Sequence, residues 1–118
     1  MGKNQLLGAK GEELIADFIT AQGYLIVERN WRIKDGEIDL IATSPSGLIT
    51  FIEVKTRSNE AFGHPLEAIN RDKAYRLQRL ALAWLVLHGK FGSDYAIDCA
   101  SVLFKEGKVE IDYRKSVL

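Results

Sequence analysis

Two strand-like segments joined by a tight turn, residues 36–41 and 51–57, constrain the fold of this chain more than any other stretch. In both segments β-branched and large apolar residues alternate with polar ones, as they do in half-buried strands. Between the segments, residues 44–47 supply two serines, a proline and a glycine, which are residues that favour turns. The pattern predicts two adjacent antiparallel strands.

The side chains of a strand point alternately to its two faces, so sequence parity predicts which of them lie together. The more polar faces of the two predicted strands carry Glu37, Asp39 and Ile41, and Phe51, Glu53 and Lys55. The opposite faces are wholly apolar and carry Ile38, Leu40, Ile52 and Val54. We therefore expect the apolar faces to meet the core, and Asp39, Glu53 and Lys55 to converge on one surface.

The predicted convergence of Asp39, Glu53 and Lys55 has the chemistry of a nuclease site. Two carboxylates suit a hard divalent cation such as Mg²⁺, which prefers oxygen ligands. A lysine beside the cation would orient a water molecule and offset the charge that develops on a phosphate under attack. The alternative is an ordinary hairpin with a solvated outer face and a surface Glu/Lys pair. These residues alone leave both interpretations open.

Several short stretches along the chain resemble the sequence motifs of one known family. They are residues 8–12 (GAKGE), 23–24 (GY), 29–32 (RNWR), 36–42 (GEIDLIA), 51–57 (FIEVKTR), 62–65 (FGHP), Lys73 and 76–77 (RL). Together they resemble the bacterial YraN-type family over nearly the whole chain. That family is similar to archaeal Holliday junction resolvases and, more broadly, to the restriction-endonuclease-like superfamily of Mg²⁺-dependent nucleases. The resemblance implies an α/β fold, a restriction-endonuclease-like three-layer sandwich in which helices flank a mixed central sheet of about five strands.

A first helix is predicted from Asn4 to Gln22, because apolar residues recur there at helical spacing and Gly23 is well placed just past its end. Within it Glu12 and Glu13 are adjacent, so only one of them can face a site on the sheet. The resemblance matches Glu12 to an acid that helps to bind metal, whereas the sequence alone equally allows a solvated carboxylate. The residues assigned catalytic roles are Glu12, Asp39, Glu53 and Lys55. Those assigned to the metal are Asp39, Glu53 and Glu12.

A second helix is predicted from Asn70 to His88, after a helical start near Pro65, and its first turns are basic. Lys73 and Arg76 are three residues apart, so they would lie on one side of the helix and could hold a phosphate of the substrate. Arg57, at the end of the preceding strand, is assigned the same nucleic-acid-binding role. A basic face that contacts only solvent is the alternative.

Three further strands complete the predicted sheet, at residues 24–28, 94–104 and 109–113. The middle one is apolar on both faces except at Asp98, which predicts a central position, and its Cys99 is expected to be a buried, inert thiol. The last strand carries the alternating charges typical of a sheet edge. The tail from Arg114 to Leu118 is expected to be loose.

Length and composition limit the protein as a whole. A chain of 118 residues with 47% hydrophobic residues suffices for one core, so we expect a single endonuclease-like domain over residues 1–118. There is no apolar run of about 18 residues and no signal-peptide core, which predicts a soluble, cytoplasmic protein without a membrane partner. The 16 basic and 16 acidic residues give zero net charge, which argues against a broad basic surface. Residues 53–90, however, hold seven basic and four acidic residues.

These features predict a Mg²⁺-dependent (or Mn²⁺-dependent) endodeoxyribonuclease that hydrolyses phosphodiester bonds in DNA, with branched (junction) DNA as one candidate substrate. The alternatives are a nucleic-acid-binding module of the same fold without turnover, and a protein-interaction domain. The presence of Asp39, Glu53 and Lys55 favours the nuclease over the binding module. The basic helix favours either of these over a protein-interaction domain. Cutting a symmetric junction would need two active sites, which keeps a homodimer open.

Overall fold

A computed structural model describes residues 3–58 and 70–117, with side chains from residue 5 onward. In chain order its elements are α1 (Lys3–Ala21), β1 (Leu25–Ile33), β2 (Gly36–Thr43), β3 (Ile49–Arg57), α2 (Arg71–Leu87), β4 (Tyr95–Lys105) and β5 (Lys108–Arg114). The predicted helices and strands are confirmed, with β1 extended through the RNWR motif. The predicted helical start near Pro65 lies outside the described residues. Neither helix in the described ranges is long and apolar enough to cross a membrane.

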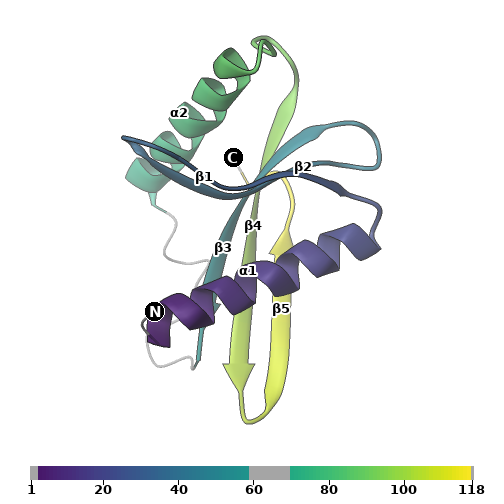
Figure 1. Cartoon of the computed structure of the whole chain (residues 1–118), viewed down its shortest axis with the longest axis vertical. Coiled ribbons are helices and arrows are strands. Elements are labelled where there is room, and N and C mark those ends of the chain that lie inside the picture. Colours follow the sequence, from purple (N-terminus) through teal and green to yellow (C-terminus); the bar gives the residue numbers. More distant parts are fainter. Residues whose placement is uncertain (1–2, 59–69, 118) are drawn as a thin grey trace.

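The five strands form a mixed sheet in the order β1-β2-β3-β4-β5 (Figure 1). Neighbouring strands are antiparallel except β3 and β4, which run parallel with Ile49 opposite Tyr95. A parallel pair needs a crossover connection, and here the crossover contains α2. The middle strand of the five is β3. Beside it, β4 pairs on both sides and is buried along most of its length, in agreement with the interior position predicted for it. Its Cys99 is 1% exposed and burial raises the pKa of the thiol to about 11, which confirms the predicted buried cysteine.

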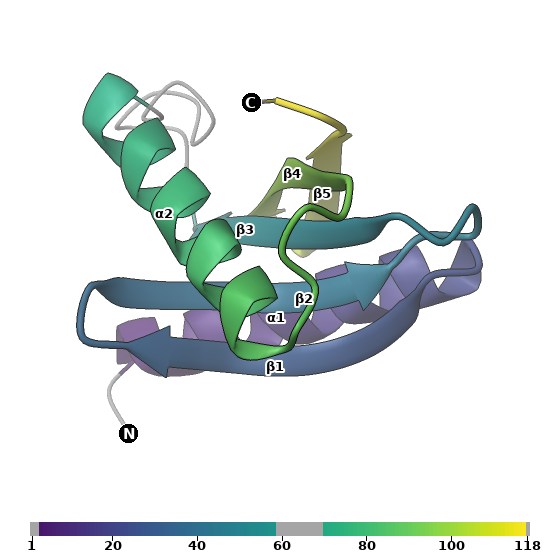
Figure 2. The same ribbon diagram turned by 90° about the horizontal axis from the view of Figure 1, so that it is seen from above.

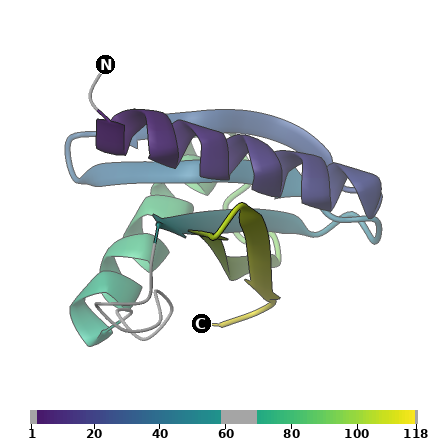
Figure 3. The ribbon, with the colours of Figure 1, turned by 90° about the horizontal axis from the view of Figure 1, so that it is seen from below.

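The two helices cover opposite faces of the sheet, as Figures 2 and 3 show from two sides. The buried cluster under α1 contains Ile15, Ala16, Ile19, Tyr24, Leu40, Ala42, Ile52, Val54, Ala100 and Val102. The buried cluster under α2 contains Ile38, Ile41, Phe51, Leu77, Leu80, Ala81, Trp84, Leu85 and Ile97. The protein is thus an α/β three-layer sandwich, as predicted, and the burial of apolar surface on both sides of the sheet is its main source of stability.

The faces of β2 differ from the predicted alternation. Ile38 packs in the cluster under α2 and Leu40 in the cluster under α1, although these residues are two positions apart. Ile41 and Phe51, expected on the polar surface, are 0% and 2% exposed. The prediction of one apolar and one polar face was wrong for two reasons. Helices cover both faces of the sheet, and the alternation of side chains shifts within β2.

The shift in β2 lies at the level of Asn30 in β1, whose φ of 50° is in the left-handed region. Arg29 and Trp31 flank Asn30 and would share a face in a regular strand. Instead Arg29 forms an ion pair with a glutamate of α1, whereas Trp31 packs under α2. Arg29 lies opposite Leu40 and Trp31 opposite Ile38, so both strands change face at the same level. Asparagine is one of the few residues besides glycine that tolerate this backbone conformation.

Helix α1 approaches β3 closely at Gly11, which is buried. A β-carbon at this position would lie 2.0 Å from Oγ1 of Thr56 and 3.0 Å from its Cβ. Because no side chain fits in that space, the glycine sets the distance between α1 and β3. The next residue in the helix is Glu12, which this close approach brings to the strands.

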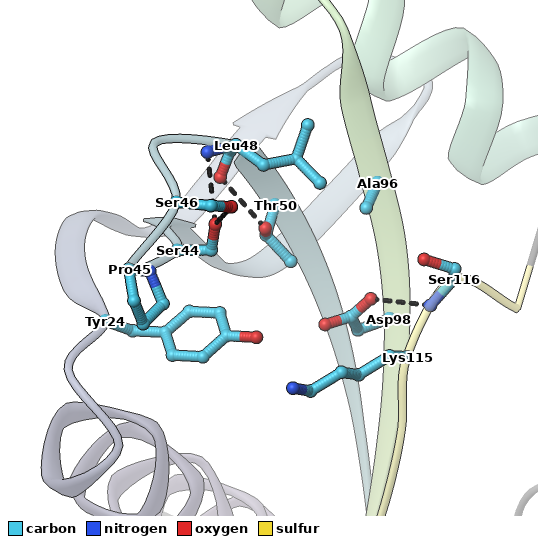
Figure 4. A pocket seen from close by; sticks show the side chains of 10 residues that line it. All are labelled: Tyr24, Ser44, Pro45, Ser46, Leu48, Thr50, Ala96, Asp98, Lys115 and Ser116. Carbon is cyan, nitrogen blue, oxygen red and sulfur yellow. Dashed lines mark hydrogen bonds between the residues drawn. The ribbon is translucent and has the colours of Figure 1, made fainter.

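The tail after β5 is held against β4, contrary to the prediction that it is loose. The amide of Val117 donates a 2.9 Å hydrogen bond to the carbonyl of Ile97, and the amide of Ser116 donates one of 2.9 Å to Oδ1 of Asp98. Asp98 is 1% exposed, and its Oδ2 accepts a 2.6 Å bond from the hydroxyl of Tyr113. A pocket of about 320 Å³ opens beside Asp98 (Figure 4). Since the chain itself supplies donors to both of its oxygens, this carboxylate serves to fix the tail.

Candidate functional site

Three carboxylates converge between α1 and β2. One oxygen from each of Glu12, Glu37 and Asp39 lies within 4.8 Å of the other two. All three side chains are partly buried, and Glu37 and Asp39 point to the same side of β2, towards α1. Carboxylate oxygens gathered at this spacing form a donor set that fits a hard cation such as Mg²⁺ or Mn²⁺.

Asp39 lies where β2 and β3 separate. The pairing between these strands ends at Leu40 and Ile52, and beyond it Oδ2 of Asp39 accepts a 2.8 Å hydrogen bond from the backbone amide of Val54. Burial, followed by the negative charge of Glu53, raises the pKa of Asp39 to about 8, although the hydrogen bond from the amide of Val54 opposes the shift. A cation bound beside Asp39 would favour its charged form.

On the side of β3 that faces α2, Glu53 and Lys55 are joined by Lys73. Oε1 of Glu53 lies 3.5 Å from Nζ of Lys55 and 3.2 Å from Nζ of Lys73. The side chain of Lys73 is only 13% exposed, so it belongs to this cluster and not to a solvated helix face. Burial and the ammonium of Lys55 lower the pKa of Lys73, and the charge of Glu53 opposes that shift. One carboxylate thus holds two ammonium groups.

Asp39 and Glu53 interact electrostatically, but they do not share a face as predicted. Asp39 lies with Glu12 and Glu37 towards α1, whereas Glu53 is paired towards α2. The candidate site therefore occupies the gap between β2 and β3 instead of lying on one surface. Of the two adjacent glutamates in α1, Glu12 is the one beside Asp39, while Glu13 forms an ion pair with β1.

The sequence pattern did not identify two residues of this group, Glu37 and Asn30, as site residues. Nδ2 of Asn30 donates to Oε1 of Glu12 at 2.8 Å and to Oε1 of Glu37 at 3.0 Å. Arg32 also donates to Oε2 of Glu37, at 2.6 Å. The parity of Glu37 with Asp39 was a signal that could have identified it. The contacts of Asn30 depend on its left-handed backbone, which the sequence pattern does not reveal.

Arg76 and Arg57, the two remaining candidates for nucleic-acid binding, lie at the edge of the candidate site. Arg76 is exposed on α2, and its aliphatic stem lies beside Gly36 at the start of β2. Arg57 is partly buried at the end of β3, and within residues 3–58 and 70–117 its Nε has no hydrogen-bond partner. The structure thus gives Arg76 a position from which it can reach an external ligand.

The raised pKa of Asp39 predicts how stability changes with pH in the metal-free protein. Its pKa is 3.8 as an isolated group and about 8 in the fold, so between these values the folded state binds the proton more tightly than the unfolded state. Stability conferred by the protonated group is complete below about pH 4 and is lost as the pH rises through about 8. Asp39→Asn keeps the acceptor for Val54 but cannot ionise.

We therefore expect the free energy of unfolding of the wild type to fall, relative to that of Asp39→Asn, as the pH rises between these limits. Chemical denaturation of both proteins in metal-free buffer at several pH values measures the difference. A difference that does not change with pH would contradict the assigned environment of Asp39.

Comparison with known proteins identifies relatives along the whole chain. Residues 11–112 match the family described as "Uncharacterised protein family UPF0102". A UPF0102 protein of Clavibacter michiganensis is 45% identical over 107 residues, which cover 91% of this chain and 90% of the relative. One of Beutenbergia cavernae is 42% identical over 118 residues, covering 99% of each chain, and one of Nocardia farcinica is 44% identical over 118 residues, covering 99% and 92%. The chain belongs to the UPF0102 family, the YraN family that its motifs resemble.

Proposed function

We propose that this protein is a divalent-cation-dependent nuclease that hydrolyses phosphodiester bonds in DNA, with branched DNA among its substrates. The observation that carries the proposal is the gathering of Glu12, Glu37 and Asp39 within 4.8 Å, next to a carboxylate that holds two lysines. Carboxylates that hold a metal ion beside a fixed positive charge are the chemistry that phosphodiester hydrolysis requires.

The chain's own residues divide the work between them. Glu12, Glu37 and Asp39 would hold Mg²⁺ or Mn²⁺, while Glu53, whose charge acts on Asp39, would hold Lys55 and Lys73 on the other side of the gap. The ion, when bound, supplies a Lewis acid that polarises a phosphate oxygen and lowers the pKa of a bound water. Lys55 would orient the attacking water and offset the negative charge that develops on the phosphate.

The proposal is tested first by metal binding. Isothermal titration of the wild type with Mn²⁺ should give heat that Asp39→Asn loses, because the variant lacks a charged ligand at the centre of the group. Incubation with duplex, single-stranded and branched DNA, with and without Mg²⁺ or Mn²⁺, then tests cleavage. If the wild type binds Mn²⁺ and DNA but cuts no substrate, the protein is a nucleic-acid-binding module of this fold. If it binds neither, the proposal fails.

The basic residues of α2 give a separate prediction about DNA affinity. Arg76→Ala should weaken binding and reduce the slope of log K against log salt by about 0.9, the value expected for one lost phosphate contact on duplex DNA. Lys73→Ala should reduce the slope by less, because the ammonium of Lys73 is already paired with Glu53. Lys90, an exposed residue beyond the other end of α2, provides a control with the same charge change. Fluorescence anisotropy across a series of salt concentrations measures the slopes. Slopes equal to that of Lys90→Ala would exclude both residues from the DNA contact.

A homodimer remains part of the proposal for branched substrates, because cutting two strands of a symmetric junction calls for two sites. Light scattering with and without junction DNA would show whether two chains assemble on it.

A further inference from the structure

The side-chain amide of Asn30 joins three elements at the candidate site. Asn30 belongs to β1, while its Nδ2 donates to Glu12 on α1 at 2.8 Å and to Glu37 on β2 at 3.0 Å. An asparagine amide carries two hydrogens, one for each of these bonds. Hydrogen bonds to charged acceptors are stronger than those between neutral groups. A single neutral group therefore fixes two carboxylates that would otherwise repel each other.

The backbone of Asn30 is what directs its amide to this place. In a regular strand Arg29 and Asn30 would point to opposite faces of the sheet. With φ at 50°, both reach α1, where Arg29 pairs with Glu13 and Asn30 with Glu12. Non-glycine residues seldom adopt this conformation, and when they do, the position often has a functional reason.

The position of Asn30 relative to Asp39 adds an independent reason. The flanking pairs of β1 and β2 join Arg29 to Leu40 and Trp31 to Ile38, so Asn30 and Asp39 lie at the same level of the two strands. The residue that carries the left-handed conformation is therefore adjacent to Asp39, and it contacts the other two carboxylates of the group directly.

We infer that Asn30 is a positioning residue for a divalent cation, holding Glu12 and Glu37 at the spacing that ligation together with Asp39 requires. This inference rests on the proposed function. Groups that hydrogen-bond to metal ligands orient them and raise metal affinity without touching the metal. A neutral amide does so without adding charge to the site.

Asn30→Gly removes the amide but retains a residue that adopts positive φ freely. We expect this variant to bind Mn²⁺ about 10- to 100-fold more weakly than the wild type in isothermal titration. Its free energy of unfolding in metal-free buffer should fall less than that of Asn30→Ala, because glycine adopts the backbone conformation without strain. Asn30→Ala loses the amide and also strains the backbone, so it should show the same loss of affinity together with lower stability. In the wild type, Mg²⁺ should shift the NMR signals of the Asn30 side-chain amide.

Glu13→Gln is the matched control, because it breaks the neighbouring ion pair between the same helix and strand. It should keep an Mn²⁺ affinity close to that of the wild type. Equal affinities of the wild type and Asn30→Gly would overturn this inference alone and leave the proposed function in place, as would an equal loss of affinity in Glu13→Gln. Failure of the wild type itself to bind Mn²⁺ would overturn both.

Discussion

Lys55→Ala is expected to lower the rate of DNA cleavage by about 10²- to 10³-fold while leaving DNA affinity nearly unchanged. The Nζ of Lys55 lies 3.5 Å from Oε1 of Glu53, and 27% of the lysine side chain is exposed. Under the proposed function, this ammonium faces the phosphate in the gap between β2 and β3. Its interaction with the substrate strengthens as negative charge develops, so the loss falls on the transition state. Single-turnover cleavage with Mg²⁺ and equilibrium binding without metal separate the two quantities.

Lys55→Arg provides a control that keeps the positive charge and should retain more activity than the alanine variant. The free energy of unfolding of each variant should also be measured, since removal of Lys55 takes away one of the two ammonium groups that pair with Glu53 among the described residues. A variant that cleaves at the wild-type rate, or that loses affinity in proportion to rate, would contradict the assigned role. The first result removes Lys55 from the chemistry, and the second makes it a binding residue.

Gly11→Ala is expected to lower the free energy of unfolding by about 1–3 kcal/mol, the usual cost of overpacking. The added β-carbon would lie 2.0 Å from Oγ1 of Thr56, so α1 must move away from β3. That movement would carry Glu12 away from Asp39, so Mn²⁺ affinity should fall as well. Chemical denaturation and isothermal titration measure the two effects.

Gly8 offers a control of opposite sign within the same helix. A β-carbon on Gly8 meets nothing within 4 Å, so Gly8→Ala should stabilise the protein by about 0.5–1 kcal/mol through helix propensity. Thr56→Ala removes the atom that Gly11→Ala would strike, so the double variant should recover part of the lost stability. If Gly11→Ala and Gly8→Ala have the same effect, the close approach of α1 does not constrain position 11.

The elements of this fold could be predicted because their boundaries have local causes. Gly23, with a φ of 94°, follows the end of α1, and Asn70 accepts a hydrogen bond from the amide of Lys73 at the start of α2. The strands are predicted by runs rich in β-branched residues that lie between turn residues. Even the edge position of β5 followed from its alternating charges.

The arrangement of the site could be predicted only in part, because it depends on contacts between distant segments. The alternation of side chains along a strand correctly predicted that Asp39 and Glu37 lie on one side of β2. It failed beyond Asp39, because the amino-acid sequence does not reveal the left-handed backbone of Asn30. The contact of Lys73 with Glu53 depends on how α2 packs across the sheet. The proximity of Glu12 followed only from family resemblance.

The parallel pairing of β3 with β4 has a consequence for the order of folding. The hairpins β1–β2 and β2–β3 close over short connections, whereas Ile49 can meet Tyr95 only after a long intervening segment has folded back. Contacts that are distant in sequence carry a larger entropic cost of loop closure, so we expect the three-strand meander to form early and β4 to dock late. On this route Asp39 and Glu53 come together in the folding nucleus before α2 brings Lys73 to them. Substitutions in the meander should therefore slow folding, whereas substitutions in β4 and β5 should accelerate unfolding.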